Sequence, residues 1–132
     1  EALGKLGPRP AAPVLLRCLK DPDPWVRRAA VEALSAVVPA ERSDELLALF
    51  RDPAPETRIA VCRVSRTLDP AVAGPEVERA LADPSPEVRA EALRAAAHLA
   101  LRSAEPLVVP LLEDPSPSVR IEAARALERL GG

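Results

Sequence analysis

The chain has 132 residues, about one domain's length, and a net charge of −2. This balance excludes a global electrostatic attraction to nucleic acid or to an acidic membrane surface. No apolar run is long enough to span a membrane and no secretory signal pattern is present, so we expect a cytoplasmic protein without a membrane segment. The two cysteines, Cys18 and Cys62, form no disulfide framework or metal-site spacing, and we interpret them as packing residues at the core of a first helix and at the edge of the core.

One short motif recurs at a fixed spacing and organises the whole chain. It reads "DPDPWVRRAA", then "DPAPETRIAV", "DPSPEVRAEA" and "DPSPSVRIEA", and each copy begins 31 residues after the previous one. The aspartates that begin the copies are Asp21, Asp52, Asp83 and Asp114. A period of this size without gaps indicates a repeat array. We interpret residues 1–9 as the tail and turn of an earlier repeat, and the chain as a piece of a longer protein.

Each copy is predicted to contain two helices. The first helices are expected to begin near Pro13, Asp44, Pro75 and Pro106. The second helices are expected to begin at the second proline of each motif, because proline suits the first helical position. The first proline of the motif ends the preceding helix. Pro110 falls inside the last of the first helices and should remove one hydrogen bond there. The predicted pairs span about 10–38, 43–69, 74–100 and 105–131.

The apolar residues of the second helices recur at helical spacing and predict one buried seam. In the first complete copy they are Val26, Ala30, Ala33, Leu34 and Val37. In the last copy they are Val119, Ala123, Ala126, Leu127 and Leu130. Helix pairs that repeat in register without strands predict an all-α fold, a right-handed α-solenoid of stacked antiparallel helix pairs that forms a single domain over 1–132.

The pattern "L-x-D-P-x-P-x-V-R-x-x-A-x-x-A-L" resembles HEAT repeats. The 31-residue period is similar to the short HEAT-like subclass of the phycobilisome-lyase type. The resemblance implies a structural ladder between neighbouring repeats, made by the four motif aspartates and four arginines. These arginines are Arg27, Arg58, Arg89 and Arg120. It also implies that the second helices line a concave face.

No catalytic constellation is apparent in the chain. His98 is the only histidine, and we expect it at a solvated or boundary position rather than in a catalytic triad. The HEAT-like iron hydroxylases use His-Glu pairs, and the dipeptide "HE" is absent here. Glu91 and Glu122 occupy equivalent positions in adjacent copies, and we interpret them as part of a solvated face. We therefore predict a non-enzymatic protein with no metal site and no cofactor.

The outward positions of the second helices supply the predicted contact surface. Arginines recur at the twelfth residue counted from the motif aspartate, and isoleucines recur at the eighth. The predicted partner-binding residues are Trp25, Arg28, Ile59, Arg63, Arg66, Arg94, Ile121 and Arg125. Arginine and aromatic side chains are favoured anchors of protein interfaces. The competing interpretation is that Glu91, Glu122 and Glu128 pair with the arginines of their own helices and neutralise the stripe.

Four functional hypotheses follow. The leading one is a scaffold that binds another protein, or an acidic peptide segment, on the concave face. The alternative is a nucleic-acid-binding module, against which the net charge and the scarcity of aromatic residues argue. A bilin lyase-like accessory protein and a structural spacer are the further alternatives. Because no polar capping repeat is evident, the apolar ends are also expected to allow end-to-end association. The residues concerned are Leu3, Leu6, Leu127 and Leu130.

Overall fold

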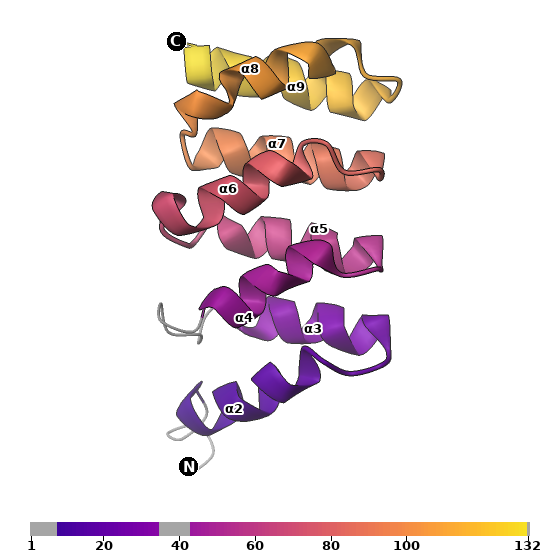
Figure 1. Cartoon of the computed structure of the whole chain (residues 1–132), viewed down its shortest axis with the longest axis vertical. Coiled ribbons are helices and arrows are strands. Elements are labelled where there is room, and N and C mark those ends of the chain that lie inside the picture. Colours follow the sequence, from indigo (N-terminus) through magenta and orange to yellow (C-terminus); the bar gives the residue numbers. More distant parts are fainter. Residues whose placement is uncertain (1–7, 35–42, 132) are drawn as a thin grey trace. The chain divides into compact units, whose positions relative to one another are not determined.

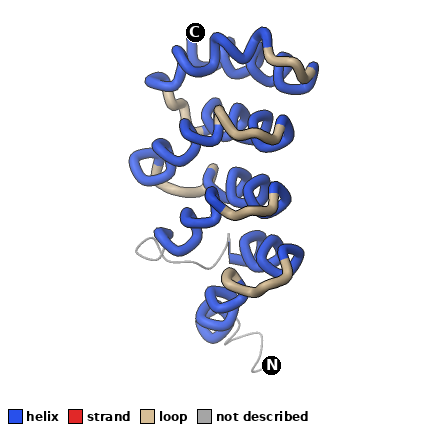
Figure 2. The backbone as a smooth tube through the Cα atoms, turned by 45° about the vertical axis from the view of Figure 1, so that its right-hand side comes forward, coloured by secondary structure: helices blue, strands red, loops and turns tan. Residues whose placement is uncertain are grey.

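The structure is a computed structural model that describes residues 8–34 and 43–131, and every regular element in these ranges is a helix (Figures 1 and 2). The predicted all-α fold of paired helices is therefore confirmed. The chain divides into two compact units, Glu1–Val64 (unit 1) and Ser65–Gly132 (unit 2). Within the described ranges, no helix combines the length and the apolar character that crossing a bilayer requires.

Unit 1 contains two helix pairs. The first pair is α2 (Pro8–Cys18), which packs against α3 (Pro24–Leu34). The second pair is α4 (Ser43–Leu47), continued by the 3-10 helix η2 (Ala48–Arg51), and α5 (Pro55–Ser65), whose last residue already belongs to unit 2. Its core is apolar and dense. The largest side chains with no exposed surface are Leu34, Leu46, Val31 and Val61.

Unit 2 repeats this plan. It begins with α6 (Pro70–Ala80) and α7 (Pro86–His98). The second pair comprises three short elements, η3 (Arg102–Ala104), α8 (Glu105–Val108) and η4 (Val109–Glu113), followed by α9 (Pro117–Gly131). α7 packs against both α6 and α9, and α9 also covers α8 and η4. The side chains buried without exposure include Val77, Val88, Leu93, Val108 and Val119.

The second helices begin at the second proline of each motif, as predicted. Each motif aspartate folds the turn before the helix, because its carboxylate accepts a hydrogen bond from the amide two residues further on. These amides belong to Asp23, Ala54, Ser85 and Ser116, each at 2.9 Å. In α7 the hydroxyl of Ser85 also accepts the Val88 amide at 3.4 Å, which is an N-cap contact.

Two of the first helices begin earlier than predicted. α2 begins at Pro8 and α6 at Pro70, so Pro13 and Pro75 lie inside these helices rather than at their starts. In α6 the cause is local, because the Asp69 carboxylate accepts the Ala71 amide at 3.0 Å and caps the helix ahead of Pro70. An aspartate followed by a proline marks the start of a helix. In α6 this pair is Asp69 and Pro70, and the predicted start at Pro75 is wrong.

The other two first helices are short and change to 3-10 geometry. α8 gives way to η4 at Val109, next to Pro110. α4 gives way to η2 at Ala48, where no proline is present, so Pro110 alone does not cause the change. Two kinds of first helix therefore alternate along the chain. An eleven-residue helix with an internal proline, as in α2 and α6, is followed by a short helix with a 3-10 continuation.

Several core predictions need correction. Ala33 is exposed, and Val37 lies outside the described residues. Cys62 is fully buried rather than at the edge of the core, whereas Cys18 is only half-buried. The expectation of an exposed apolar flank at the end of the chain is wrong for Leu130, which is buried because α9 packs against α7 and α8. Leu127 is half-buried, and the predicted Leu3 and Leu6 lie outside the described residues.

α7 ends in a tight left-handed turn. The Leu101 amide bonds the Ala96 carbonyl at 3.0 Å and the Ala100 amide bonds the Ala97 carbonyl at 3.1 Å, which is the Schellman pattern. Ala100 has a φ of 56°, a conformation that usually requires glycine. The turn buries Leu101. Its side chain lies close to Gly74, where a Cβ atom would be only 3.3 Å from it.

Candidate functional site

The motif arginines lock the turn that precedes each second helix. In every copy the arginine Nη1 donates to the carbonyl of the motif aspartate six residues earlier, and also to the carbonyl of the following proline at 3.2 Å. The bonds to the aspartate carbonyl measure 2.7 Å from Arg27, Arg58 and Arg120 and 2.8 Å from Arg89. The motif thus makes the same capped turn four times.

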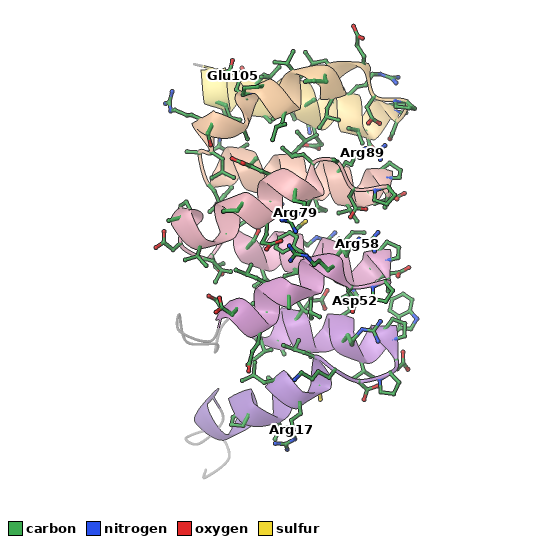
Figure 3. All side chains as sticks on the ribbon, in the orientation of Figure 1. Arg17, Asp52, Arg58, Arg79, Arg89 and Glu105 are labelled. Carbon is green, nitrogen blue, oxygen red and sulfur yellow. The ribbon has the colours of Figure 1, made fainter. Side chains whose placement is uncertain are left out.

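Within each unit, one motif arginine also reaches the aspartate of the next copy. In unit 1, Arg27 donates Nε and Nη2 to the Asp52 carboxylate at 2.7 and 3.0 Å. In unit 2, Arg89 donates Nη2 to the Asp114 carboxylate at 3.0 Å, and its Nε lies 2.9 Å from the other carboxylate oxygen in an ion pair without hydrogen-bond geometry. Figure 3 labels Asp52 and Arg58 beside the turn before α5, and Arg89 in unit 2. Both buried carboxylates thus form an ion pair with a guanidinium group, and the Arg27–Asp52 pair has two parallel hydrogen bonds, the strongest geometry for such a pair.

The electrostatics follow from this pairing. The hydrogen bond with Asp52 raises the pKa of Arg27 above its ordinary value, against the opposing effect of desolvation. Burial alone would raise the pKa of Asp114. The hydrogen bonds from Arg89 and from the Ser116 amide outweigh burial and leave the pKa of Asp114 below its ordinary value. Both shifts favour the charged forms, as expected for an ion pair.

A second set of charges alternates across unit 2, and we name it the Arg–Glu chain: Arg66, Glu91, Arg94, Glu122 and Arg125. Glu91 accepts Arg66 Nη2 at 3.3 Å and Arg94 Nη1 at 2.7 Å. Glu122 accepts Arg94 Nη2 at 2.9 Å and Arg125 Nη1 at 3.4 Å. Arg94 on α7 therefore joins its own helix to α9, through two carboxylates.

The two glutamates of this chain are buried, which corrects their interpretation as a solvated face. Glu91 is 4% exposed and Glu122 is 8% exposed. They stay buried because each one is bonded to two guanidinium groups, which offsets the loss of hydration. The bond to Glu122 raises the pKa of Arg94 above its ordinary value, while desolvation acts in the opposite direction.

The arginines of the chain open onto one depression, which we name the arginine pocket. Its volume is about 330 Å³, and it lies over α7 and α9. Its polar lining residues are Arg66, Arg94, His98, Glu122, Arg125 and Arg129, and its apolar floor is Leu93, Ala97 and Ala126. The exposed side-chain fraction rises from 32% for Arg66 to 44% for Arg94 and 71% for Arg125. The buried carboxylates thus hold guanidinium groups that still face solvent.

The predicted contact residues of unit 1 are arranged differently. Trp25 is 60% exposed, and the guanidinium carbon of Arg28 lies 5.5 Å from the centre of its ring, a cation–π contact. Arg28 also pairs with Glu32 at 3.2 Å. Ile59 is half-buried and Arg63 is exposed. In unit 2 Ile121 is 52% exposed but does not line the arginine pocket.

The first helices provide a different surface in both units. In unit 1 an apolar groove of about 610 Å³ lies along α2, α4 and η2, with Leu16, Leu19 and Leu49 in its lining. In unit 2 a groove of about 450 Å³ lies in the equivalent place, with Leu81, Leu107 and Leu111 in its lining. These grooves recur wherever an eleven-residue first helix is followed by a short one.

Four residues of the Arg–Glu chain and the arginine pocket are not among the predicted contact residues: Glu91, Glu122, His98 and Arg129. A signal for the glutamates exists at the ninth position of each copy. Alanine occupies it in the first two copies, as Ala29 and Ala60, and glutamate replaces it in the last two. Ala60 is fully buried although Ala29 is exposed, so a glutamate at this position, three residues before an arginine, indicates a buried ion pair.

Comparison with known proteins supports the fold. The sequence profile of the family described as HEAT repeats matches residues 1–66 and 75–132. A search of curated proteins gave no match.

Two solved structures have similar folds. The complex of CpcE and CpcF of phycocyanin lyase from Nostoc sp. PCC7120 aligns with a TM-score of 0.77 at 24% identity, over 98% of this chain and 56% of that one. The crystal structure of an engineered protein aligns with a TM-score of 0.69 at 24% identity, over 91% of this chain and 62% of that one. This chain thus spans about three fifths of each.

Proposed function

The chain belongs to the HEAT repeat family, and from this premise we propose that it is a non-enzymatic, cytoplasmic interaction scaffold whose arginine pocket holds an acidic segment of a partner protein. The observation that carries the proposal is the Arg–Glu chain. Glu91 and Glu122 accept hydrogen bonds from Arg94 at 2.7 and 2.9 Å, yet the Arg94 side chain remains 44% exposed. A positioned and exposed guanidinium loses little conformational entropy when it binds a carboxylate.

The net charge of the pocket favours an acidic partner. The pocket and its paired carboxylates have a net charge of +2, because they combine four arginines with two glutamates. These residues are Arg66, Arg94, Arg125 and Arg129, with Glu91 and Glu122. The chain as a whole has a net charge of −2. Attraction for an anion is therefore local to this face, which suits a segment of a protein better than an extended polyanion.

We propose a structural role for the ladder residues, which are Asp21, Asp52, Asp83, Asp114, Arg27, Arg58, Arg89 and Arg120. The contacts at Arg27 and Arg89 support it, because they tie consecutive copies together at buried carboxylates. The ladder leaves little room for a ligand. Arg89 already bonds the Asp83 carbonyl and contacts both carboxylate oxygens of Asp114.

The structural likeness to the CpcE and CpcF complex supports a second candidate, a bilin lyase-like accessory protein. That likeness is at 24% identity, so it carries over the fold and not the residues of a site. The test is a change in visible absorbance when a bilin is added to the chain, alone and together with a candidate partner subunit. No spectral change in either mixture would leave the scaffold as the better explanation.

The scaffold proposal is tested by selection from a displayed library of random peptides on the intact chain. We expect enriched peptides to be rich in aspartate and glutamate and to lose binding when Arg125 and Arg129 are both changed to glutamine. Both arginines are exposed, so these changes leave the core intact. A matched control changes Arg79 and Arg102 to glutamine, since both are exposed, lie outside the pocket lining and remove the same charge. The contact of Arg102 with the Leu130 carbonyl is long, at 3.5 Å, so its loss should matter little.

The outcomes separate the hypotheses. Acidic peptides that bind the control variant but not the pocket variant support the proposal. Enrichment of apolar peptides that bind both variants equally would move the contact surface to the grooves of the first helices. Binding of duplex DNA with a steep dependence on salt, lost in the pocket variant, would instead support the nucleic-acid alternative.

A further inference from the structure

We propose that the arginine pocket recognises one phosphoryl group, carried by a phosphoserine or phosphothreonine of the partner. This inference rests on the proposed function, and it names the chemical group that occupies the centre of the pocket. Arg94 and Arg125 are the principal contacts, Arg129 and His98 form the rim, and Glu91 and Glu122 are positioning residues that hold the guanidinium groups.

Charge balance is the first argument. The pocket and its paired carboxylates have a net charge of +2, from four guanidinium groups and two glutamates. A phosphorylated side chain has a charge of roughly −1.5 to −2 near neutral pH, whereas a single glutamate has −1. One phosphoryl group therefore neutralises the site, and one carboxylate leaves it positive.

The free donors are the second argument. Arg94 uses one N–H of Nη1 for Glu91 and one of Nη2 for Glu122, which leaves other N–H groups of its planar fork available. Arg125 makes one long contact at 3.4 Å and is 71% exposed in its side chain. In the described ranges of the chain, no hydrogen bond or ion pair joins the side chain of Arg129 or His98 to another residue. Several donors that converge from two helices suit the three oxygens of a phosphoryl group.

The shape of the pocket favours a phosphorylated peptide over nucleic acid. The volume of about 330 Å³ accommodates one side chain and its phosphoryl group, and none of the lining residues is phenylalanine, tyrosine or tryptophan. Single-stranded nucleic acid is typically held by several large aromatic side chains along a basic groove, and His98 is the only aromatic ring in the lining of this pocket. The apolar floor of Leu93, Ala97 and Ala126 suits the aliphatic part of a peptide.

The test follows the arginine Nε–H signals of the intact chain by NMR during titration with inorganic phosphate and, separately, with acetate, at about 0.1 M ionic strength. We expect phosphate to shift the signals of Arg94 and Arg125 with at least about tenfold higher affinity than acetate. Changing Arg125 and Arg129 to glutamine should weaken phosphate binding by about tenfold or more. The Arg79 and Arg102 double variant should bind as the original chain does.

A peptide series then separates this inference from the proposed function. It uses one acidic peptide selected on the chain, with its central residue as serine, glutamate or phosphoserine. Tightest binding of the phosphoserine form, lost in the pocket variant, supports the inference. Equal binding of the glutamate and phosphoserine forms would overturn the phosphoryl assignment and leave the scaffold standing. Failure of every anion and peptide to bind would overturn both, and tighter binding of an oligonucleotide than of the phosphopeptide would replace the partner class.

Discussion

The two units of the chain share one architecture and differ in one buried position. Each unit contains a capped turn at every motif and an ion pair between consecutive copies, Arg27 with Asp52 in unit 1 and Arg89 with Asp114 in unit 2. At the ninth position of each copy, however, unit 1 has alanines and unit 2 has glutamates. Only in unit 2 does this position belong to a buried chain of alternating charges.

This difference shows that the fold and the candidate site depend on separate residues. The ladder recurs in both units, so it is a property of the repeat. The Arg–Glu chain depends on two glutamates that the repeat does not require, because Ala60 occupies the equivalent position and is fully buried in unit 1. The predictions below test this separation, from the largest expected effect to the smallest.

Removal of a shared contact should cost the most. Asp114→Ala removes the partner of Arg89 and the acceptor of the Ser116 amide, so we expect a loss of about 2–3 kcal/mol in the free energy of unfolding. Urea denaturation followed by circular dichroism measures it. Asp21→Ala is the matched control, because this carboxylate accepts the Asp23 amide of its own turn but is bonded to no arginine within the described residues. Equal losses in the two variants would show that the turn, and not the pair between copies, supplies the stability.

Removal of a contact specific to unit 2 should cost less. Glu122→Ala restores the alanine that unit 1 has at this position, and we expect a loss of about 1 kcal/mol because both arginine partners are partly exposed. Urea denaturation followed by circular dichroism measures the loss. A variant as stable as the original chain would show that the glutamate serves the pocket alone.

Ala100→Gly should stabilise unit 2 by about 1 kcal/mol. The φ of 56° at Ala100 is unfavourable for alanine and free of steric cost for glycine. The side chain is exposed, so its removal takes away no packing. Thermal unfolding would reveal a raised midpoint. A lowered midpoint would mean that the flexibility of glycine in the unfolded chain outweighs the relief of strain.

The smallest effect concerns pH. The pKa of Asp114 is lowered from its ordinary value of 3.8 in the folded state. Its stabilising contribution is therefore complete above that value and is lost as the pH falls through the lower, folded-state pKa. We expect the stability difference between the original chain and Asp114→Asn to be constant near neutral pH and to shrink below about pH 4. A difference that persists unchanged into strong acid would contradict the assigned direction.

Much of the fold could be predicted from the sequence because its signals are local and repeated. The second prolines mark the starts of the second helices, and the apolar spacing of α9 identifies Val119, Ala123 and Ala126 as core. The starts of α2 and α6 differ from the prediction because each helix contains more than one proline, and the predicted start is an internal one. In such a helix, spacing alone does not decide which proline is first.

The candidate site was less predictable, because it depends on distance between helices. The sequence shows that Glu91 precedes Arg94 by three residues, so pairing within α7 could be anticipated. It does not show that Arg94 also reaches Glu122 on the neighbouring helix, a contact at 2.9 Å between residues 28 positions apart. Burial of both glutamates follows from that second contact, and only the packing of α7 against α9 reveals it.

The alternation of two kinds of first helix bears on how such a chain can grow. The eleven-residue helices α2 and α6 begin 62 residues apart, twice the sequence period, and the starts of α4 and α8 are separated by the same distance. Insertion or loss of a single copy would place two helices of the same kind in succession. Addition of two copies together preserves the alternation, so a lengthened variant should be built in steps of two copies.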